Sequence, residues 1–226
     1  MNAEWTLELL ASLLNGTIYG RKDLTFSGLS IDSRTLIPSR ETLFVALTGD
    51  QHDGHNYIAG LYKRGIRTFL VSRLPEYKKF PDAGFCQVDD TLSALQEIAS
   101  ARRRQFSGEV LAITGSNGKT IVKEWIYQCM GDSFRIHRSP KSYNSQVGVP
   151  LSVWGIEPEH QLAVIEAGIS RPGEMEKLHQ VILPDTGIFT HFGTAHQEHF
   201  SSQEQKLKEK LLLFRGCTKV ICRADC

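Results

Sequence analysis

The sequence has few features of secreted or membrane proteins. Its five cysteines are odd in number and include no C-x-x-C pair, so neither a disulfide framework nor a common zinc site is indicated. No apolar run approaches the ~20 residues of a transmembrane helix. No basic segment precedes an apolar stretch at the N-terminus, as a signal peptide would require. Reduced thiols in a cytoplasmic protein are the simplest interpretation.

An excess of charge of either sign is also lacking. The 26 lysines and arginines are balanced by 25 aspartates and glutamates, which leaves a formal net charge of +1. A nucleic-acid-binding surface usually requires a clustered basic excess, so we expect neither nucleic-acid binding nor membrane insertion. The 226 residues, of which 41 % are hydrophobic, suffice for one large or two small globular domains.

The sequence does contain a phosphate-binding pattern between residues 109 and 130. An apolar run at 110–113 predicts a buried strand, residues 114–118 form a glycine-rich turn, and helical periodicity starts at residue 119. Backbone N–H groups at the start of such a helix point at a bound anion, and the helix dipole favours negative charge there. The apolar face of the helix is predicted to carry Ile121, Val122, Trp125, Ile126 and Met130.

This loop is predicted to bind the phosphates of ATP. The residues involved are Gly115, Ser116, Asn117, Gly118, Lys119 and Thr120. Lys119 would reach the outer phosphates, and the Thr120 hydroxyl would bind Mg²⁺. The common eight-residue motif needs a glycine at position 113, which is isoleucine here, so the loop is a shorter G-x-x-G-K-T variant. A chance Gly-Lys-Thr in an ordinary strand-to-helix turn is the alternative interpretation.

Strands alternate with helices along the chain, which predicts an α/β fold. Residues 1–106 can close as a small α/β domain, and residues 107–226 then form a doubly wound, mainly parallel sheet domain that is incomplete. Strands are expected near 17–20, 26–31, 42–47, 67–72, 84–88, 110–113, 134–137, 162–165, 186–190 and 218–222. Helices are expected near 4–14, 56–64, 92–105, 119–130 and 202–214, with a short helix that ends near Pro150.

Polar residues follow several of these strands, where ligands gather in doubly wound folds. Glu166 ends the apolar run at 162–165, and His196 lies beyond the strand at 186–190. Together with Thr120 they predict a Mg²⁺ centre, because Mg²⁺ prefers oxygen ligands and keeps water and phosphate in its shell. The histidine spacing is not that of H-E-x-x-H, so zinc is not favoured.

A second polar cluster follows a strand of the N-terminal domain. Asp32, Ser33 and Arg34 could simply cap a turn. They could equally present a carboxylate, a hydroxyl and a guanidinium to a polar ligand.

These motifs together resemble the ATP-dependent Mur ligases of bacterial peptidoglycan synthesis. The loop T-G-S-N-G-K-T is similar to the family's T-G-[TS]-N-G-K-T. Before it come I-D-S-R at 31–34, L-F-V-A-L-T-G at 43–49 and D-G-H at 53–55. After it come N-S-Q-V-G-V-P-L at 144–151, V-I-E-A-G at 164–168, G-E-M at 173–175, P-D at 184–185 and G-T-A-H at 193–196. The resemblance therefore covers most of the chain.

The N-terminal motifs look most like those of family members that add D-alanyl-D-alanine (D-Ala-D-Ala) to UDP-N-acetylmuramoyl-tripeptide (UDP-MurNAc-tripeptide). That resemblance implies ATP-dependent amide ligation through an acyl phosphate, with residues 1–106 binding the UDP-sugar and residues 107–226 binding ATP. It implies catalytic roles for Lys119, Glu166, His196 and Lys210. It implies Mg²⁺ binding by Thr120, Glu166, His196 and a carbamoylated Lys210. It implies substrate binding by Ser30, Asp32, Ser33, Arg34 and Asn144.

The chain departs from the family pattern in several places. Ser145 follows Asn144 where a second asparagine is usual, and His191 also replaces an asparagine. Leu211 and Leu212 follow Lys210 where x-Glu is usual. The family's C-terminal domain does not follow residue 226 in this sequence. We therefore expect the chain to bind ligands but to need the remaining ligase domains of a parent chain for ligation.

Three alternatives remain open from the sequence. A folylpolyglutamate synthase-like ligase shares the loop but is disfavoured by the N-terminal domain with its D-S-R. A P-loop kinase or NTPase would need the eight-residue loop and an aspartate at a strand end, whereas the acid here is Glu166. A non-catalytic UDP-sugar-binding module is the third.

Overall fold

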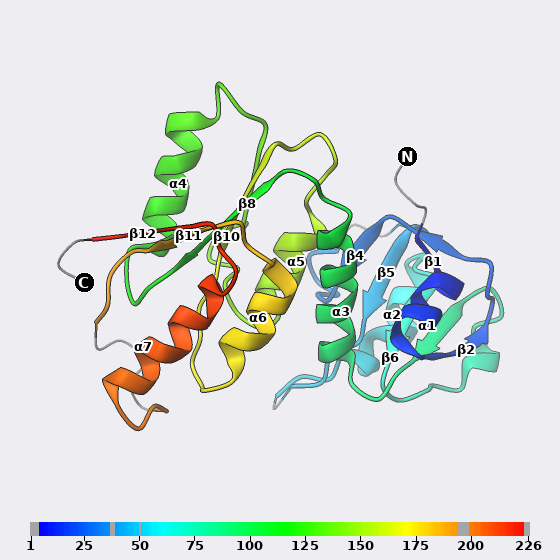
Figure 1. The fold of residues 1–226 in the computed structure, drawn as a ribbon. Helices are drawn as coiled ribbons and strands as arrows, with labels where there is room; N and C mark the ends of the chain where they lie inside the picture. The colour runs from blue at the N-terminus through cyan, green and yellow to red at the C-terminus, as the bar shows by residue number, and fades with distance from the viewer. Residues whose placement is uncertain (1–4, 37–38, 50, 194–198, 224–226) are drawn as a thin grey trace. The chain divides into compact units, whose positions relative to one another are not determined.

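The computed structural model describes residues 5–36, 39–49, 51–193 and 199–223. The chain forms two compact units, Met1–Ile98 and Ala99–Cys226, and helix α3 (Thr91–Arg104) begins in the first and ends in the second. Strands and helices alternate in both units (Figure 1), so the predicted α/β fold is confirmed. Within the described ranges, no helix is long and apolar enough to cross a membrane.

The first unit contains a five-stranded sheet in the order β2-β7-β6-β5-β4. Its strands are β2 (Thr17–Gly20), β4 (Gly28–Ser30), β5 (Thr42–Val45), β6 (Thr68–Val71) and β7 (Gly84–Gln87). Within this five-stranded sheet β2 pairs antiparallel with β7, and the other neighbouring strands pair in parallel. The unit also contains β1 (Trp5–Thr6), β3 (Thr25–Phe26), α1 (Leu7–Leu14), α2 (Ile58–Lys63) and the 3₁₀ turns η1 (Gly54–Tyr57) and η2 (Tyr77–Lys79).

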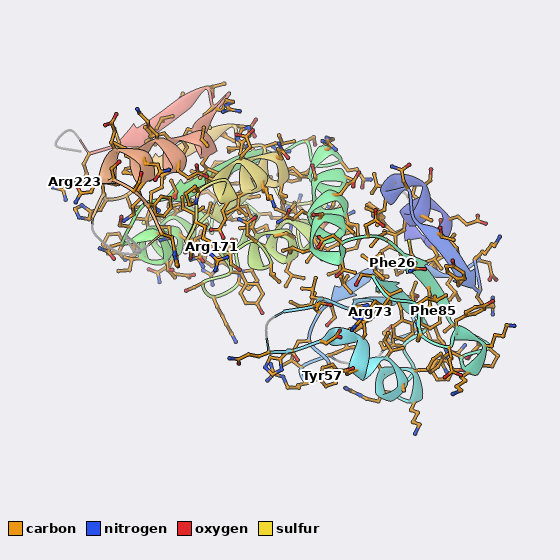
Figure 2. All side chains as sticks on the ribbon, turned by 90° about the horizontal axis from the view of Figure 1, so that it is seen from below. Phe26, Tyr57, Arg73, Phe85, Arg171 and Arg223 are labelled. Carbon is orange, nitrogen blue, oxygen red and sulfur yellow. The ribbon has the colours of Figure 1, made fainter. Side chains whose placement is uncertain are left out.

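Three buried phenylalanines form the core between this sheet and helix α2. The parallel register places Phe44, Phe69 and Phe85 side by side on β5, β6 and β7, and all three are fully buried. The Phe69 and Phe85 rings stack with centroids 5.1 Å apart. Figure 2 shows Phe85 inside the unit and Tyr57 at its surface. This core fixes the carboxyl end of β4, from which the D-S-R residues extend.

The second unit contains a fully parallel sheet in the order β12-β11-β8-β10-β9. Its strands are β8 (Glu109–Thr114), β9 (Ile136–Arg138), β10 (Leu162–Glu166), β11 (Thr186–Phe189) and β12 (Lys219–Cys222). Helix α4 (Lys119–Met130) packs on one face (Figure 1). The other face carries α5 (Gly148–Trp154), α6 (Glu174–Ile182) and η3 (Leu212–Phe214), which follows α7 (Gln203–Leu211). Helices on both faces of a parallel sheet are the predicted doubly wound arrangement.

The buried face of α4 differs from the prediction. Val122, Ile126 and Met130 pack against the sheet, as the i, i+4, i+8 spacing requires. Ile121 and Trp125 were predicted to share this face, but they are 57 % and 62 % exposed. Ile121 and Trp125 each precede a packed residue by one position, which turns their side chains away from the sheet. This part of the prediction was wrong.

Two further helices differ from expectation. α5 continues through Pro150 to Trp154 rather than ending near the proline. Pro150 is the third residue of the helix, where its missing N–H would have no intrahelical partner in any case. α6 was not predicted, although Met175, Leu178, Val181 and Ile182 are buried along it at helical spacing.

Candidate functional site

The phosphate-binding loop lies between β8 and α4, at the carboxyl edge of the second sheet. Gly115 and Gly118 have φ values of 150° and 83°, a region that residues with side chains adopt only with strain. Helix α4 starts at Lys119, and no side-chain hydrogen bond caps it. Its first N–H groups therefore face the loop and can receive an anion.

The segment after β11 forms several hydrogen bonds with this loop. The Thr190 hydroxyl donates to the Asn117 carbonyl at 2.6 Å. The Ser116 N–H donates to the His191 carbonyl at 2.7 Å, and the Ser116 hydroxyl and Gly193 exchange two bonds of 3.0 Å. These bonds support the backbone of the loop on the side of β11.

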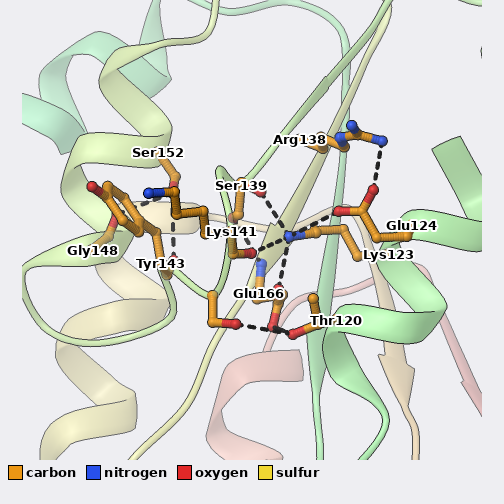
Figure 3. A network of polar contacts seen from close by, with 11 residues as sticks. Thr120, Lys123, Glu124, Arg138, Ser139, Lys141, Tyr143, Gly148, Ser152 and Glu166 are labelled. Atoms are coloured by element: carbon orange, nitrogen blue, oxygen red, sulfur yellow. Dashed lines mark hydrogen bonds and ion pairs between the residues drawn. The ribbon is translucent and has the colours of Figure 1, made fainter.

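Glu166 reaches the loop because β10 pairs in parallel with β8. Its register partner is Ile113, two residues before Gly115. The Thr120 hydroxyl donates to Glu166 Oε1 at 2.9 Å, and the glutamate is completely buried (Figure 3). The structure thus brings together Thr120 and Glu166, two of the three predicted Mg²⁺ ligands that lie within the described residues. The third, Lys210, donates to the Gly115 carbonyl of the loop.

These two residues fit a Mg²⁺ ion. Hydroxyl and carboxylate oxygens are the hard ligands that Mg²⁺ prefers. Glu166 Oε2 is buried 2.9 Å from the Lys123 amine, so Oε1, which lies beside the Thr120 hydroxyl, is the oxygen available to a metal ion. No group of three or more His, Cys, Asp or Glu side chains converges in the described ranges. Phosphate and water would therefore complete the coordination. His196 lies outside the described residues, and its metal role stays a prediction.

Three lysines surround the loop. Lys119 Nζ and Lys210 Nζ both donate to the Gly115 carbonyl, at 3.0 and 3.2 Å, and Lys206 Nζ donates to the Gly193 carbonyl at 2.7 Å. Burial lowers the pKa of all three amines. The pKa of Lys210 falls to about 8, because its burial is reinforced by the positive charges of Lys119 and Lys206. Such a cluster of cations is suited to a polyanion such as a nucleotide triphosphate.

A cavity of about 340 Å³ opens beside this cluster. It is lined by Gly115, Lys119, Asn144, Ser145, Gln146, Val147, Gly168, Ile169, Ser170, Glu174 and Lys210. Asn144 is held in the wall by its carbonyl, which accepts from the Gly168 N–H at 2.8 Å. The structure therefore places Asn144 beside the loop lysines.

The other predicted substrate residues lie in the first unit. Arg34 forms a bidentate ion pair with Asp32, with both contacts at 3.0 Å, and the Arg34 side chain is 85 % exposed. Hydrogen bonds from Arg34 lower the pKa of Asp32 to about 2. The Ser30 hydroxyl accepts from the Asp32 N–H at 3.3 Å, and Arg64 donates to the Ser33 carbonyl. The pair closes a turn and still exposes a guanidinium, so ligand binding by these residues stays a prediction.

The D-G-H motif has a structural explanation. His55 Nδ1 lies 2.6 Å from Asp53 Oδ1, and His55 Nε2 accepts from the backbone N–H groups of Ser72 and Arg73 at 3.1 and 3.2 Å. This pattern requires a proton on Nδ1 and none on Nε2, and burial lowers the pKa of His55 accordingly. The motif ties its loop to the end of β6.

Several contacts of the site were not predicted from the sequence. Lys123 is completely buried on α4, and Thr190, Gly193 and Lys206 support or surround the loop. For Lys123 a signal was present, because a lysine between Val122 and Ile126 falls on the packed side of the helix. The contacts of Thr190 and Gly193 depend on chain segments more than 70 residues apart, which periodicity does not show.

The fold and the loop are those of the phosphate-loop class of domains. Comparison with protein families gives two matches. The Mur ligase middle domain matches residues 113–226, and the catalytic domain of the Mur ligase family matches residues 25–103. The chain belongs to the Mur ligase family.

Individual relatives agree with this family. The UDP-N-acetylmuramoyl-tripeptide–D-alanyl-D-alanine ligase of Bacillus subtilis is 30 % identical over 214 residues, which cover 93 % of this chain and 46 % of the relative. A crystal structure of MurF from Acinetobacter baumannii superposes with a TM-score of 0.86 at 25 % identity, covering 97 % of this chain and 49 % of that one. MurF ligase from Thermotoga maritima, solved in complex with ADP, has a TM-score of 0.77 at 25 % identity, with coverages of 88 % and 46 %. The chain thus spans about half the length of the relatives it matches.

The glycines of the loop provide a test of its geometry. A Cβ on Gly115 would clash with Thr190 Oγ1 and lie 3.0 Å from the His191 carbonyl oxygen, whereas a Cβ on Gly118 would meet nothing closer than 3.9 Å. Gly115 also has the φ value farther from the left-handed region that L-residues can adopt, so its backbone strain and its clash act in the same direction. We expect Gly115→Ala to lower the free energy of unfolding by about 1–3 kcal/mol more than Gly118→Ala, measured by urea denaturation. Equal losses would show that Thr190 does not support the loop.

Proposed function

We propose that this chain supplies the UDP-sugar-binding and ATP-binding parts of an ATP-dependent carbon–nitrogen ligase. The ligase would add D-Ala-D-Ala to UDP-MurNAc-tripeptide in peptidoglycan precursor synthesis. The observation that carries the proposal is the Thr120–Glu166 contact of 2.9 Å beside a lysine-lined phosphate loop. The similarity to the Bacillus subtilis ligase, whose name describes this reaction, supports the proposal. So do the two Mur ligase family matches, one before residue 106 and one after it.

The proposed reaction has two steps. A carboxylate oxygen of the tripeptide attacks the γ-phosphorus of ATP, the bond to the β-phosphate oxygen breaks, and ADP leaves. The amine of D-Ala-D-Ala then attacks the acyl carbon, an amide forms with loss of a proton, and inorganic phosphate leaves with the electrons of the C–O bond. Phosphorylation replaces a poor leaving group with a good one, and positioning of the reactants lowers the remaining barrier.

The residues of the second unit have distinct proposed roles. The N–H groups of residues 117–120 and the Lys119 amine would hold the phosphates, because the segment from Thr190 to Gly193 already supports the loop. Thr120 and Glu166 would hold one Mg²⁺ and His196 would hold a second, and these ions would neutralise charge on the phosphates. Asn144 and Lys210 line the cavity next to Gly115. Asn144 would contact the UDP-sugar substrate, and Lys210, once carbamoylated, would supply an anionic oxygen ligand to Mg²⁺.

The first unit is proposed to hold the UDP-sugar through Ser30, Asp32, Ser33 and Arg34. The exposed Arg34 guanidinium can pair with a phosphate in bidentate fashion. The remaining partners proposed for the chain are the other ligase domains of a parent protein. A cytoplasmic location is proposed from the free thiols of Cys86, Cys129, Cys217 and Cys222.

Calorimetric titration of each ligand separately tests the proposal. We expect the chain to bind ADP and UDP-MurNAc-tripeptide independently. Lys119→Ala should weaken ADP binding by roughly tenfold or more and leave UDP-MurNAc-tripeptide binding unchanged, because a charged hydrogen bond to phosphate contributes about 1.5–3 kcal/mol. Arg34→Ala should have the opposite pattern.

Each variant is therefore the control for the other. A chain that binds ADP but no UDP-sugar would contradict the ligase assignment. A chain that binds only the UDP-sugar would support the non-catalytic binding module instead.

Lys210 provides a pH-dependent test of its proposed carbamoylation. A lowered pKa means that the reactive free amine is half populated near pH 8 and scarce at pH 6. Carbamoylation would also convert the Lys210 side chain from a cation to an anion. The positive charges of Lys119 and Lys206 nearby favour the anionic form. At constant dissolved ¹³CO₂ we expect a ¹³C NMR carbamate signal that grows from pH 6 to pH 8.

The matched control is the neighbouring Lys208, which is exposed and paired with Glu204 on the same helix. The signal should disappear in Lys210→Arg and persist in Lys208→Arg. A signal that survives in Lys210→Arg would assign the carbamate elsewhere.

A further inference from the structure

Helix α4 buries a charged side chain one turn after the phosphate loop. Lys123 is completely buried, and its amine donates to the Ser139 carbonyl at 2.7 Å and to the Lys141 carbonyl. The amine also lies 2.9 Å from Glu166 Oε2 and 3.3 Å from Glu124 Oε1 (Figure 3). A buried ammonium group is costly unless its hydrogens are satisfied, and these contacts hold it in one place.

The partner carboxylate of Glu166 is held from both sides. Oε1 accepts from the Thr120 hydroxyl at 2.9 Å, and Oε2 faces the Lys123 amine. The Glu166 backbone N–H donates to the Ser139 hydroxyl at 3.1 Å. The carboxylate therefore lies between a loop hydroxyl and a buried cation, and the cation determines which oxygen faces the loop.

Lys123 does not belong to the lysine cluster that faces the ligand. Lys119 and Lys210 line the cavity and donate to Gly115, whereas Lys123 is absent from the cavity wall. It is fully buried behind the Glu166 carboxylate and cannot touch a phosphate. Its direct contact with the predicted metal ligands is therefore the Glu166 carboxylate.

We propose that Lys123 is a positioning residue for the metal site. It holds the Glu166 carboxylate with Oε1 beside Thr120 Oγ1, so that a Mg²⁺ ion carried by a bound nucleotide meets both oxygens without rearrangement. This inference rests on the proposed nucleotide-binding function. A purely stabilising role is the weaker explanation, because replacing a buried ion pair by apolar groups is often neutral or stabilising. Partners behind a metal ligand, in contrast, commonly set metal affinity.

The test measures ADP binding to the 226-residue chain by calorimetry, once with MgCl₂ and once with EDTA. The ratio of the two affinities is the Mg²⁺-dependent gain. Lys123→Met keeps the side-chain volume and removes the charge. We expect it to reduce the Mg²⁺-dependent gain by about 10- to 100-fold and to leave ADP binding in EDTA as in the unmodified chain. A gain that is unchanged in Lys123→Met would overturn the proposal.

Arg103→Met is the matched control for loss of a buried cation. Arg103 is 8 % exposed and donates to the Ile182 and Leu183 carbonyls at 2.8 Å. It also pairs with Asp185, which precedes β11 at the opposite edge of the sheet from the loop. Arg103→Met should change thermal stability and leave the Mg²⁺-dependent gain intact. An equal loss of the gain in both variants would assign the effect to general destabilisation and contradict the proposal.

A Lys123→Met chain that fails to fold is also decisive, through the double variant Lys123→Met/Glu166→Gln. If the uncompensated carboxylate causes the failure, removing its charge restores folding, as the pairing of Lys123 with Glu166 predicts. A double variant that is equally unfolded would assign Lys123 to its carbonyl contacts and overturn the proposal. If the unmodified chain binds no ADP under either condition, the nucleotide-binding function itself fails, and this inference falls with it.

Discussion

The carboxylate of Glu166 is completely buried between the Thr120 hydroxyl and the Lys123 amine. A charge at that depth is tolerated only with a partner, and the partner is available because α4 begins at Lys119 and turns Lys123 toward the sheet. The position of the carboxylate depends in turn on the parallel pairing of β10 with β8, which aligns Glu166 with Ile113. The proposed metal site thus depends on the strand register and on the rotation of α4 that turns Lys123 toward the sheet.

The same register organises the rest of the site. β8 pairs with β10 along one edge and with β11 along the other. The segment from Thr190 to Gly193, which follows β11, therefore lies next to the loop and bonds to its backbone and to Ser116. Lys206 and Lys210 then approach from α7 and donate to Gly193 and Gly115. The amines of Lys119, Lys206 and Lys210 are thus held beside the loop by backbone carbonyls. Their positive charges lie where the phosphates of a nucleotide would bind.

Much of this arrangement could be predicted from the sequence. Glycine positions, apolar runs and the Gly-Lys-Thr order are local signals, and they correctly predicted β8, the start of α4 and Glu166 at the end of β10. The face of α4 could not be predicted in full, because Ile121 and Trp125 are apolar and yet exposed. Burial of Lys123 depends on carbonyls at Ser139 and Lys141, 16 and 18 residues away, and no helical pattern encodes them.

We propose that Thr120 and Glu166 form a preformed Mg²⁺ site at the phosphate loop. A crystal structure of the chain with ADP and Mg²⁺ would test this site. We expect the β-phosphate over the N–H groups of residues 117–120, with Mg²⁺ about 2.0–2.1 Å from the Thr120 hydroxyl and bound to the Glu166 carboxylate. A nucleotide bound away from this loop, or a metal ion held without Glu166, would contradict it.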